Sequence, residues 1–126
     1  MHQAIDGGVS FFDCCWEYNR GKSEDWLGKG VRGHRKDVFL MTKVCTHGRG
    51  GSLAEQMLEQ SLRRLHTDYL DLWQVHGVGF QNDPELFIRP GGAAEALTKA
   101  KREGKVKFVG FTGHKDPHTR LSRPQP

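Results

Sequence analysis

The sequence predicts an α/β fold in which four parallel strands alternate with helices. Short apolar runs of strand length alternate along the chain with runs in which apolar residues recur every three or four positions. The strand-like runs are apolar at nearly every position, as is typical of parallel strands covered on both faces. The chain has 126 residues, which suits one domain and excludes a complete (β/α)₈ barrel, because that fold needs about 200 residues or more.

The first expected strand spans residues 8–13, and the first expected helix spans residues 23–31. The strand segment is rich in β-branched and aromatic residues and follows a glycine pair, so we expect it to be buried. Ser23 is the expected N-cap of the helix, and two acidic residues follow it where the helix dipole favours anions. Gly33 lies where a helix stop is expected.

The second strand is expected over residues 38–43, and it ends in a lysine. Ser52 and Glu55 have the spacing of a capping box, which predicts that the clearest helix of the chain begins there. The apolar residues that follow recur on one helical face, as in a helix packed on a sheet: Leu58, Leu62 and Leu65.

A third strand is expected over residues 69–75, and a loop containing prolines and glycines then leads to a helix over residues 93–102. Residues 106–111 form the last expected strand. The end of the chain shows no periodicity. We therefore expect one domain over residues 4–117 and a disordered tail over residues 118–126.

The composition is that of a soluble globular chain, with 27% charged and 36% hydrophobic residues. The net charge is +4, and the basic residues form no clustered stripe of the kind that nucleic-acid binding requires. No apolar run approaches the roughly 18 residues of a membrane span, and the start lacks a signal-peptide pattern. We expect a cytoplasmic protein without a nucleic-acid or membrane partner.

The cysteines point to reduced thiols. Their number is three, and the adjacent pair Cys14 and Cys15 would strain a local disulfide. Together with Cys45, His47 and His76 they would lie near one rim of the sheet, which leaves a soft-metal site as an alternative. The spacing matches no structural zinc pattern, so we expect no metal.

Polar side chains mark the ends of three successive strands. Asp13, Lys43 and His76 each follow an apolar run, and Tyr18 lies in the loop after the first strand. The carboxyl ends of parallel strands meet at one edge, where α/β folds place their chemistry. The sequence therefore predicts that these four side chains converge.

Convergence would make a general acid aimed at a carbonyl oxygen. A phenol ordinarily titrates near pH 10, and a nearby ammonium favours the phenolate, so Lys43 would assist proton donation by Tyr18. Asp13 would hold the lysine, and His76 would orient the carbonyl. Each residue also has a structural alternative: a turn cap, a solvated rim charge, a scaffold hydrogen bond or a cover over the core.

Several spaced motifs agree in order with one known family. The chain resembles the aldo-keto reductases in five stretches, which together fall within residues 4–117: residues 8–13 with Tyr18, 21–28, 38–43, 59–72 followed by His76, and 104–112.

The resemblance implies a partial (β/α)₈ barrel, truncated at both ends and comprising the second to fifth βα units. It implies NADPH-dependent reduction of aldehydes or ketones to alcohols, with a tetrad of Asp13, Tyr18 as proton donor, Lys43 and His76. Thr112 falls where the family contacts the nicotinamide carboxamide. The residues after it, Gly113-His114, depart from the asparagine common in the family.

The resemblance leaves alternatives to a working reductase. The family's first strand and everything after its fifth have no counterpart in this sequence, including the aromatic ring that stacks on nicotinamide and the basic residues that hold the 2′-phosphate. An inactive truncated fragment and a non-catalytic cofactor-binding accessory module of the same fold remain open. We expect a small carbonyl substrate, and homodimerisation or aggregation through the open edge strands at residues 8–13 and 106–111.

Overall fold

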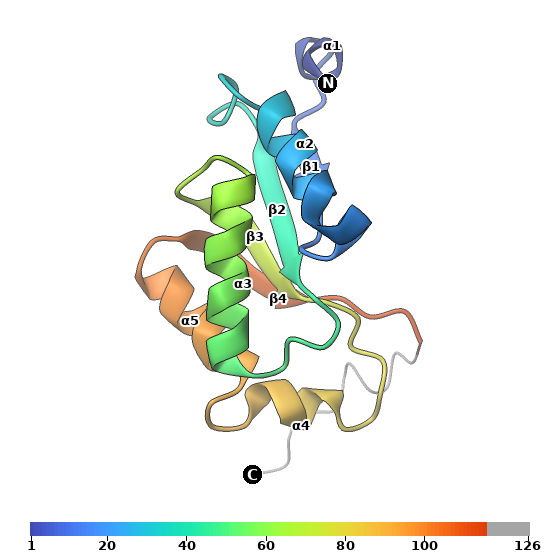
Figure 1. Ribbon diagram of the computed structural model, residues 1–126, viewed down its shortest axis with the longest axis vertical. Coiled ribbons are helices and arrows are strands. Elements are labelled where there is room, and N and C mark those ends of the chain that lie inside the picture. The colour runs from blue at the N-terminus through green and yellow to red at the C-terminus, as the bar shows by residue number, and fades with distance from the viewer. Residues whose placement is uncertain (116–126) are drawn as a thin grey trace.

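The structure is a computed structural model that describes residues 1–115, and its centre is one four-stranded parallel sheet (Figure 1). The strand order, β1-β2-β3-β4, follows the chain. The prediction of four parallel strands alternating with helices is therefore confirmed. The strands are β1 (Phe11–Asp13), β2 (Phe39–Val44), β3 (Leu70–Val75) and β4 (Val106–Phe111).

Three long helices, α2, α3 and α5, lie on one side of this sheet (Figure 1). Two short helices, α1 and α4, complete the described chain together with a 3₁₀ turn, η1. The helical bounds are α1 (His2–Asp6), η1 (Tyr18–Gly21), α2 (Lys22–Gly30), α3 (Gly51–Arg64), α4 (Asp83–Ile88) and α5 (Ala93–Arg102).

The core fills the space between the sheet and these helices. Alternate residues of a strand point to opposite faces, and the inward-pointing residues of the central strands are fully buried. They pack with the apolar stripes predicted for α3 and α5. The principal contributors are Leu40, Val44, Trp73 and Val75 from the strands and Leu58, Leu62, Leu65 and Leu97 from the helical segments.

The opposite face of the sheet carries an exposed row of aromatic rings, which we call the aromatic face: Phe11, Phe39 and Phe108. Phe39 stacks on Phe11 at 5.1 Å and on Phe108 at 6.4 Å between ring centroids. Phe11 and Phe108 are 56% and 57% exposed. The prediction that residues 8–13 form a buried strand is therefore wrong. Strand β1 has three residues at an edge of the sheet, and only Phe12 packs against the core.

A buried carboxylate joins α2, β2 and α3. Glu24, one of the two acidic residues expected in a first helical turn, is completely buried and accepts hydrogen bonds from the Thr42 and Ser61 hydroxyls at 2.6 and 2.7 Å. Arg64 adds an ion pair at 3.1 Å. Because Glu24 lies on α2 while its partners lie on β2 and α3, the carboxylate fixes both helices against the sheet.

The helix starts differ from the predicted caps. Helix α2 begins after Gly21, whose φ of +87° favours glycine, and Ser23 instead accepts a hydrogen bond from Asn19 at 2.8 Å. The helix ends at Gly30, three residues before the predicted stop at Gly33. The left-handed turn at the end of η1 therefore sets where α2 begins, and Ser23 does not cap the helix.

The predicted capping box of α3 is also wrong. The N-cap is Gly50, without a side-chain hydrogen bond, and Ser52 lies inside the first turn. Glu55 pairs with Lys99 of α5 at 2.9 Å and does not return to the helix start. A tertiary ion pair has replaced the local cap.

Two elements were not predicted, and one prediction lies outside the described residues. Helix α4 occupies the expected loop, with Pro84 in its first turn, where the missing N–H is tolerated. Helix α1 precedes the first strand. The predicted tail over residues 118–126 lies beyond residue 115, and the predicted domain limits stay a prediction. Within the described part of the chain, no helix has both the length and the apolar character that crossing a membrane requires.

Candidate active site

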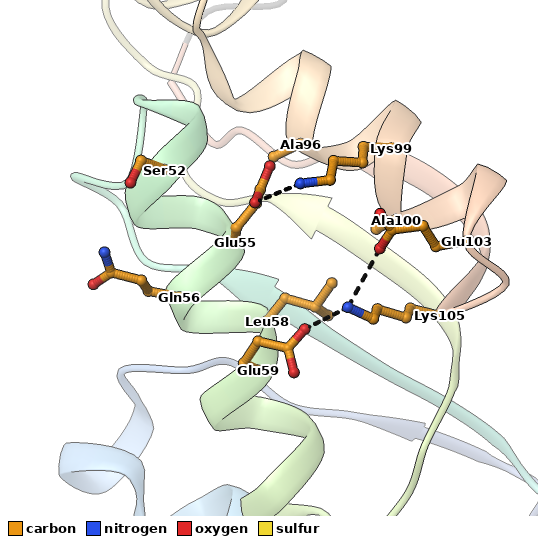
Figure 2. Close-up of a pocket in the computed structure, with 10 residues that line it drawn as sticks. All are labelled: Ser52, Glu55, Gln56, Leu58, Glu59, Ala96, Lys99, Ala100, Glu103 and Lys105. Carbon is orange, nitrogen blue, oxygen red and sulfur yellow. Dashed lines mark hydrogen bonds and ion pairs between the residues drawn. The ribbon is translucent and has the colours of Figure 1, made fainter.

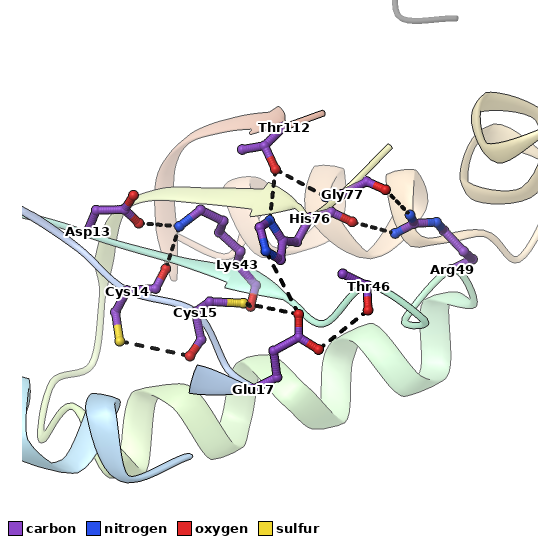
Figure 3. A network of polar contacts seen from close by, with 10 residues as sticks. All are labelled: Asp13, Cys14, Cys15, Glu17, Lys43, Thr46, Arg49, His76, Gly77 and Thr112. Carbon is purple, nitrogen blue, oxygen red and sulfur yellow. Dashed lines mark hydrogen bonds and ion pairs between the residues drawn. The ribbon is translucent and has the colours of Figure 1, made fainter. Parts of the chain in front are cut away.

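A buried ammonium lies at the carboxyl ends of β1 and β2. The Lys43 Nζ donates hydrogen bonds to Asp13 Oδ1 and, at 2.8 Å, to the carbonyl oxygen of Cys14 (Figure 3). The lysine side chain is 5% exposed, whereas that of Asp13 is 50% exposed. The buried charge is therefore satisfied by a carboxylate at the surface and a carbonyl from the same loop, as a buried charge requires.

The rings of Tyr18 and His76 pack against each other close to the Lys43 ammonium. Lys43 Nζ lies 5.3 Å from the centroid of the Tyr18 ring. The Tyr18 and His76 rings are edge to face, with centroids 6.0 Å apart. The structure thus brings together all four residues predicted to converge, Asp13, Tyr18, Lys43 and His76, with the tyrosine partly exposed.

A strained turn follows Tyr18. Asn19 and Arg20 have φ values of 49° and 56°, in the left-handed region, and Gly21 continues the turn at +87°. Asparagine and glycine tolerate this region, but for arginine the conformation costs on the order of 1 kcal/mol. Strain of this kind persists where the surroundings fix the backbone, and here it directly follows Tyr18, whose ring lies near Lys43 Nζ.

A hydrogen bond with Thr112 orients the imidazole of His76. Its Nδ1 lies 2.9 Å from Thr112 Oγ1, and the same oxygen accepts a hydrogen bond from the Gly77 N–H at 3.1 Å. Burial lowers the pKa of His76, and the charge of Lys43 acts in the same direction. The ring is therefore neutral at pH 7, with its Nε2 on the side away from Thr112.

Arg49 stabilises the backbone at His76 through hydrogen bonds. Its guanidinium donates to the carbonyl oxygens of His76 and Gly77 at 3.0 and 3.2 Å, and it pairs with Asp83 at 3.1 Å. Burial alone would raise the pKa of Asp83, but hydrogen bonds from two backbone N–H groups and from Arg49 lower it. Sequence reasoning missed both residues, because they lie in segments that carry no periodic pattern.

Glu17 is a further member of the site that the sequence did not indicate. Its Oε1 lies 3.8 Å from His76 Nε2 and 4.0 Å from Cys15 Sγ, and the Thr46 hydroxyl donates to Oε2 at 3.4 Å (Figure 3). The only signal in the sequence is its place directly before Tyr18. The carboxylate therefore faces the imidazole from the side opposite Thr112.

A shallow groove lies elsewhere, on the outer side of the helical layer (Figure 2). It has a volume of about 330 Å³ and is lined by residues of α3 and α5 and the turn after α5. Ion pairs from Glu55 to Lys99 and from Glu59 to Lys105 line it. None of the four converging residues lines this groove, so we place the chemistry at the strand ends.

Known proteins resemble the chain over nearly all its length. The model of the aldo/keto reductase family matches residues 1–121. Methylglyoxal reductase YeaE of Escherichia coli (strain K12) is 39% identical over 112 residues, which cover 89% of this chain and 37% of the relative. L-galactose dehydrogenase of Arabidopsis thaliana is 31% identical over 120 residues, covering 90% of this chain and 37% of the relative.

Solved structures agree. An aldo-keto reductase from Klebsiella pneumoniae in complex with NADPH matches with a TM-score of 0.79 at 30% identity, over 95% of this chain and 39% of that chain. Another structure from that organism, with NADP and acetate, has a TM-score of 0.74 at 31% identity, over 93% of this chain and 38% of that chain. The match to part of larger chains confirms the predicted partial barrel. With its family model matched over residues 1–121, the chain belongs to the aldo/keto reductase family.

Proposed function

We propose that the chain carries the proton-donating and carbonyl-binding part of an NADPH-dependent oxidoreductase that reduces aldehydes or ketones to alcohols. The observation that carries the proposal is the placement of Lys43 Nζ, paired with Asp13 and 5.3 Å from the Tyr18 ring. A phenol backed by a buried ammonium is suited to giving up a proton, because the resulting phenolate is stabilised.

The residues divide the reaction between them. The Tyr18 hydroxyl donates its proton to the carbonyl oxygen, which becomes the alcohol oxygen, and the ammonium of Lys43 stabilises the phenolate that remains. Neutral His76 in its Nε2–H form donates a hydrogen bond to the same carbonyl oxygen. NADPH, when bound, supplies the hydride to the carbonyl carbon.

Thr112 fits the predicted contact with the cofactor. When His76 carries its proton on Nε2, the Thr112 hydroxyl donates to Nδ1, and one lone pair accepts from the Gly77 N–H. The second lone pair is free to accept from a carboxamide N–H. The nicotinamide would thus be held by the residue that orients the imidazole.

The relatives suggest where to look for substrates. One is named a methylglyoxal reductase, and two solved neighbours hold NADPH or NADP. We therefore take small aldehydes and dicarbonyl compounds as the substrate class. The three free cysteines are consistent with the reducing cytoplasm as the site of action.

Cofactor binding and turnover test the proposal separately. NADPH binding is followed by quenching of tryptophan fluorescence, and turnover by NADPH oxidation with methylglyoxal and with simple aldehydes. We expect Tyr18→Phe to lower kcat by about 100-fold or more while NADPH still binds. Tyr69→Phe is the matched control and keeps kcat within about twofold, because Tyr69 contacts Arg35 and Lys107 outside the site.

Two results would replace the proposal with an alternative. Saturable NADPH binding without turnover of any carbonyl would indicate a non-catalytic accessory module. A folded chain that binds no NADPH would indicate an inactive fragment. Equal turnover by Tyr18→Phe and the unaltered chain would reject Tyr18 as the acid.

A further inference from the structure

Three different metal-ligating side chains meet beside the candidate acid. The Sγ of Cys15, a carboxylate oxygen of Glu17 and a ring nitrogen of His76 all lie within 4.8 Å of one another. The three side chains point toward one another (Figure 3), and Cys15 and His76 are buried whereas Glu17 is partly exposed. We infer that Cys15, Glu17 and His76 form a binding site for a thiophilic divalent cation such as Zn²⁺.

The distances suit a cation of this size. The Glu17 oxygen lies 4.0 Å from the Cys15 sulfur and 3.8 Å from His76 Nε2. A tetrahedral zinc ion holds sulfur, nitrogen and oxygen ligands about 3.3–3.6 Å apart, given its ordinary bond lengths. Binding therefore requires these two pairs, each of which includes Glu17, to close by about half an ångström, which the partly exposed Glu17 side chain can supply.

The ligand types select the metal. Thiolate, imidazole and carboxylate together favour zinc over magnesium or calcium, which prefer oxygen ligands. Three protein ligands leave the fourth tetrahedral position open to water, as in an accessible zinc site. On binding, the Cys15 thiol loses its proton to solvent, and its sulfur replaces the weak hydrogen bond to Glu17 with a bond to the metal.

The imidazole is already oriented for coordination. Thr112 lies 2.9 Å from Nδ1 and can accept a hydrogen bond from it, which leaves the Nε2 lone pair facing Glu17. Ligating histidines ordinarily have such an outer partner, which fixes both the tautomer and the ring plane. The nearby ammonium of Lys43 is paired with Asp13, which moderates its repulsion of a cation.

A second trio shares the carboxylate. Glu17, Cys45 and His47 also bring ligand atoms within 4.8 Å of one another. His47 is exposed on a loop, whereas His76 is buried and held by Thr112. The ordered imidazole therefore favours the site on Cys15 and His76, and the Cys45 variant tests the choice.

The sequence favoured no metal, since the residues follow no structural zinc spacing. The fold changes this assessment, because the end of β3 brings His76 back to the loop after β1. A cation on Nε2 would prevent that nitrogen from donating to a carbonyl oxygen, so Zn²⁺ would inhibit reduction. This consequence rests on the proposed function, whereas binding itself does not.

The test uses the full chain, stripped of metal, titrated with Co²⁺ and with Zn²⁺. Co²⁺ reports the thiolate through a sulfur-to-cobalt absorption band in the near ultraviolet, and Zn²⁺ affinity is measured by competition with a chromophoric chelator. We expect a thiolate band in the unaltered chain. Cys15→Ser should abolish it, and both Cys15→Ser and Glu17→Gln should weaken Zn²⁺ binding by about 100-fold.

Cys14→Ser and Cys45→Ser are the matched controls, and we expect affinities within about twofold of the unaltered chain. Absence of the thiolate band, or unchanged affinity in Glu17→Gln, would overturn the site. Loss of binding in Cys45→Ser with retention in Cys15→Ser would also overturn it, in favour of the second trio. Circular dichroism checks each fold, and Glu17→Gln decides the outcome if Cys15→Ser unfolds.

Discussion

The imidazole of His76 and the hydroxyl of Thr112 lie 2.9 Å apart, although 36 residues separate them along the chain. The contact joins the ends of β3 and β4, and the Gly77 N–H donates to the same hydroxyl oxygen at 3.1 Å. The direction of this hydrogen bond depends on the ring tautomer. With the proton on Nε2, Thr112 donates to Nδ1 and Nε2–H can donate to a carbonyl oxygen. With the proton on Nδ1, the ring donates to Thr112 and the Nε2 lone pair can bind a metal.

Thr112→Val tests this contact, because valine has a similar shape and lacks the hydroxyl. We expect the free energy of unfolding to fall by about 1–2 kcal/mol, since the ring nitrogen and the Gly77 N–H both lose a partner. Thr112→Ser keeps the oxygen and should stay within about 0.5 kcal/mol. Urea denaturation measures both, and an equal loss in the two variants would mean that the methyl group matters more than the hydroxyl.

The pair of Lys43 and Asp13 should respond asymmetrically to mutation. Asp13→Ala leaves a buried ammonium without its counter-charge, which should cost about 1.5–3 kcal/mol of stability. Lys43→Met leaves a half-exposed carboxylate that water can solvate, and it should cost about 1 kcal/mol or less. Chemical denaturation of the two variants checks the order, and a larger loss for Lys43→Met would contradict it.

The neutral imidazole predicts a pH dependence of stability. Because burial lowers the pKa of His76, the unfolded chain takes up a proton near pH 6.5 that the folded chain does not. The free energy of unfolding therefore declines as the pH falls below 6.5, until the folded ring also protonates.

His76→Gln should remove that decline in urea titrations between pH 7 and pH 5 (roughly the range in which histidine titrates). The lowered pKa of Asp83 acts in a separate window, since its stabilisation is lost only below its ordinary value of 3.8. An unchanged pH profile in His76→Gln would show that another group is responsible.

In the folded, metal-free chain the thiols should be inert toward disulfide reagents. Burial raises the pKa of Cys14 to about 11 and that of Cys15 to about 12, and it also raises the pKa of Cys45. The thiolate is the reactive form, so we expect labelling by an aromatic disulfide at pH 7 to proceed only as fast as the chain unfolds. In denaturant all three free cysteines should react at once. Rapid labelling of folded protein would contradict this prediction.

The aromatic face and the edge strands predict self-association. Phe11 and Phe108 are more than half exposed, and each lies on an edge strand with an unpaired backbone side. We expect sedimentation velocity to show concentration-dependent dimers or larger species that Phe108→Lys reduces. Trp26→Lys, an exposed aromatic on α2, is the control. A folded monomer at all concentrations would reject the association.

Sequence reasoning succeeded where the pattern was periodic. The alternation of apolar runs predicted all four strands, and the bounds of the last helix, residues 93–102, agree with α5. The convergence of Asp13, Tyr18, Lys43 and His76 followed from one topological rule, that parallel strands end at the same edge.

It failed where a tertiary contact overrode a local preference. Glu55 has capping-box spacing, but its carboxylate pairs with Lys99 of a neighbouring helix. The helix dipole explained Glu24 in a first helical turn, but the spacing did not indicate its three partners on β2 and α3. Arg49 and Glu17 both contact His76, and they do so only because the loops that carry them fold back beside it. No strand-end rule applies to the loop that carries Arg49, so its contact with the His76 carbonyl oxygen, 27 residues away along the chain, could not be predicted.

The strand order has a consequence for how the chain assembles. Each strand pairs with the one made just before it, so no strand must enter between two that are already paired. As synthesis proceeds from the N-terminus, every newly completed strand finds its partner at the growing margin of the sheet. The fold can therefore be built one strand–helix step at a time, and the four side chains of the candidate acid come together only when the third strand has docked.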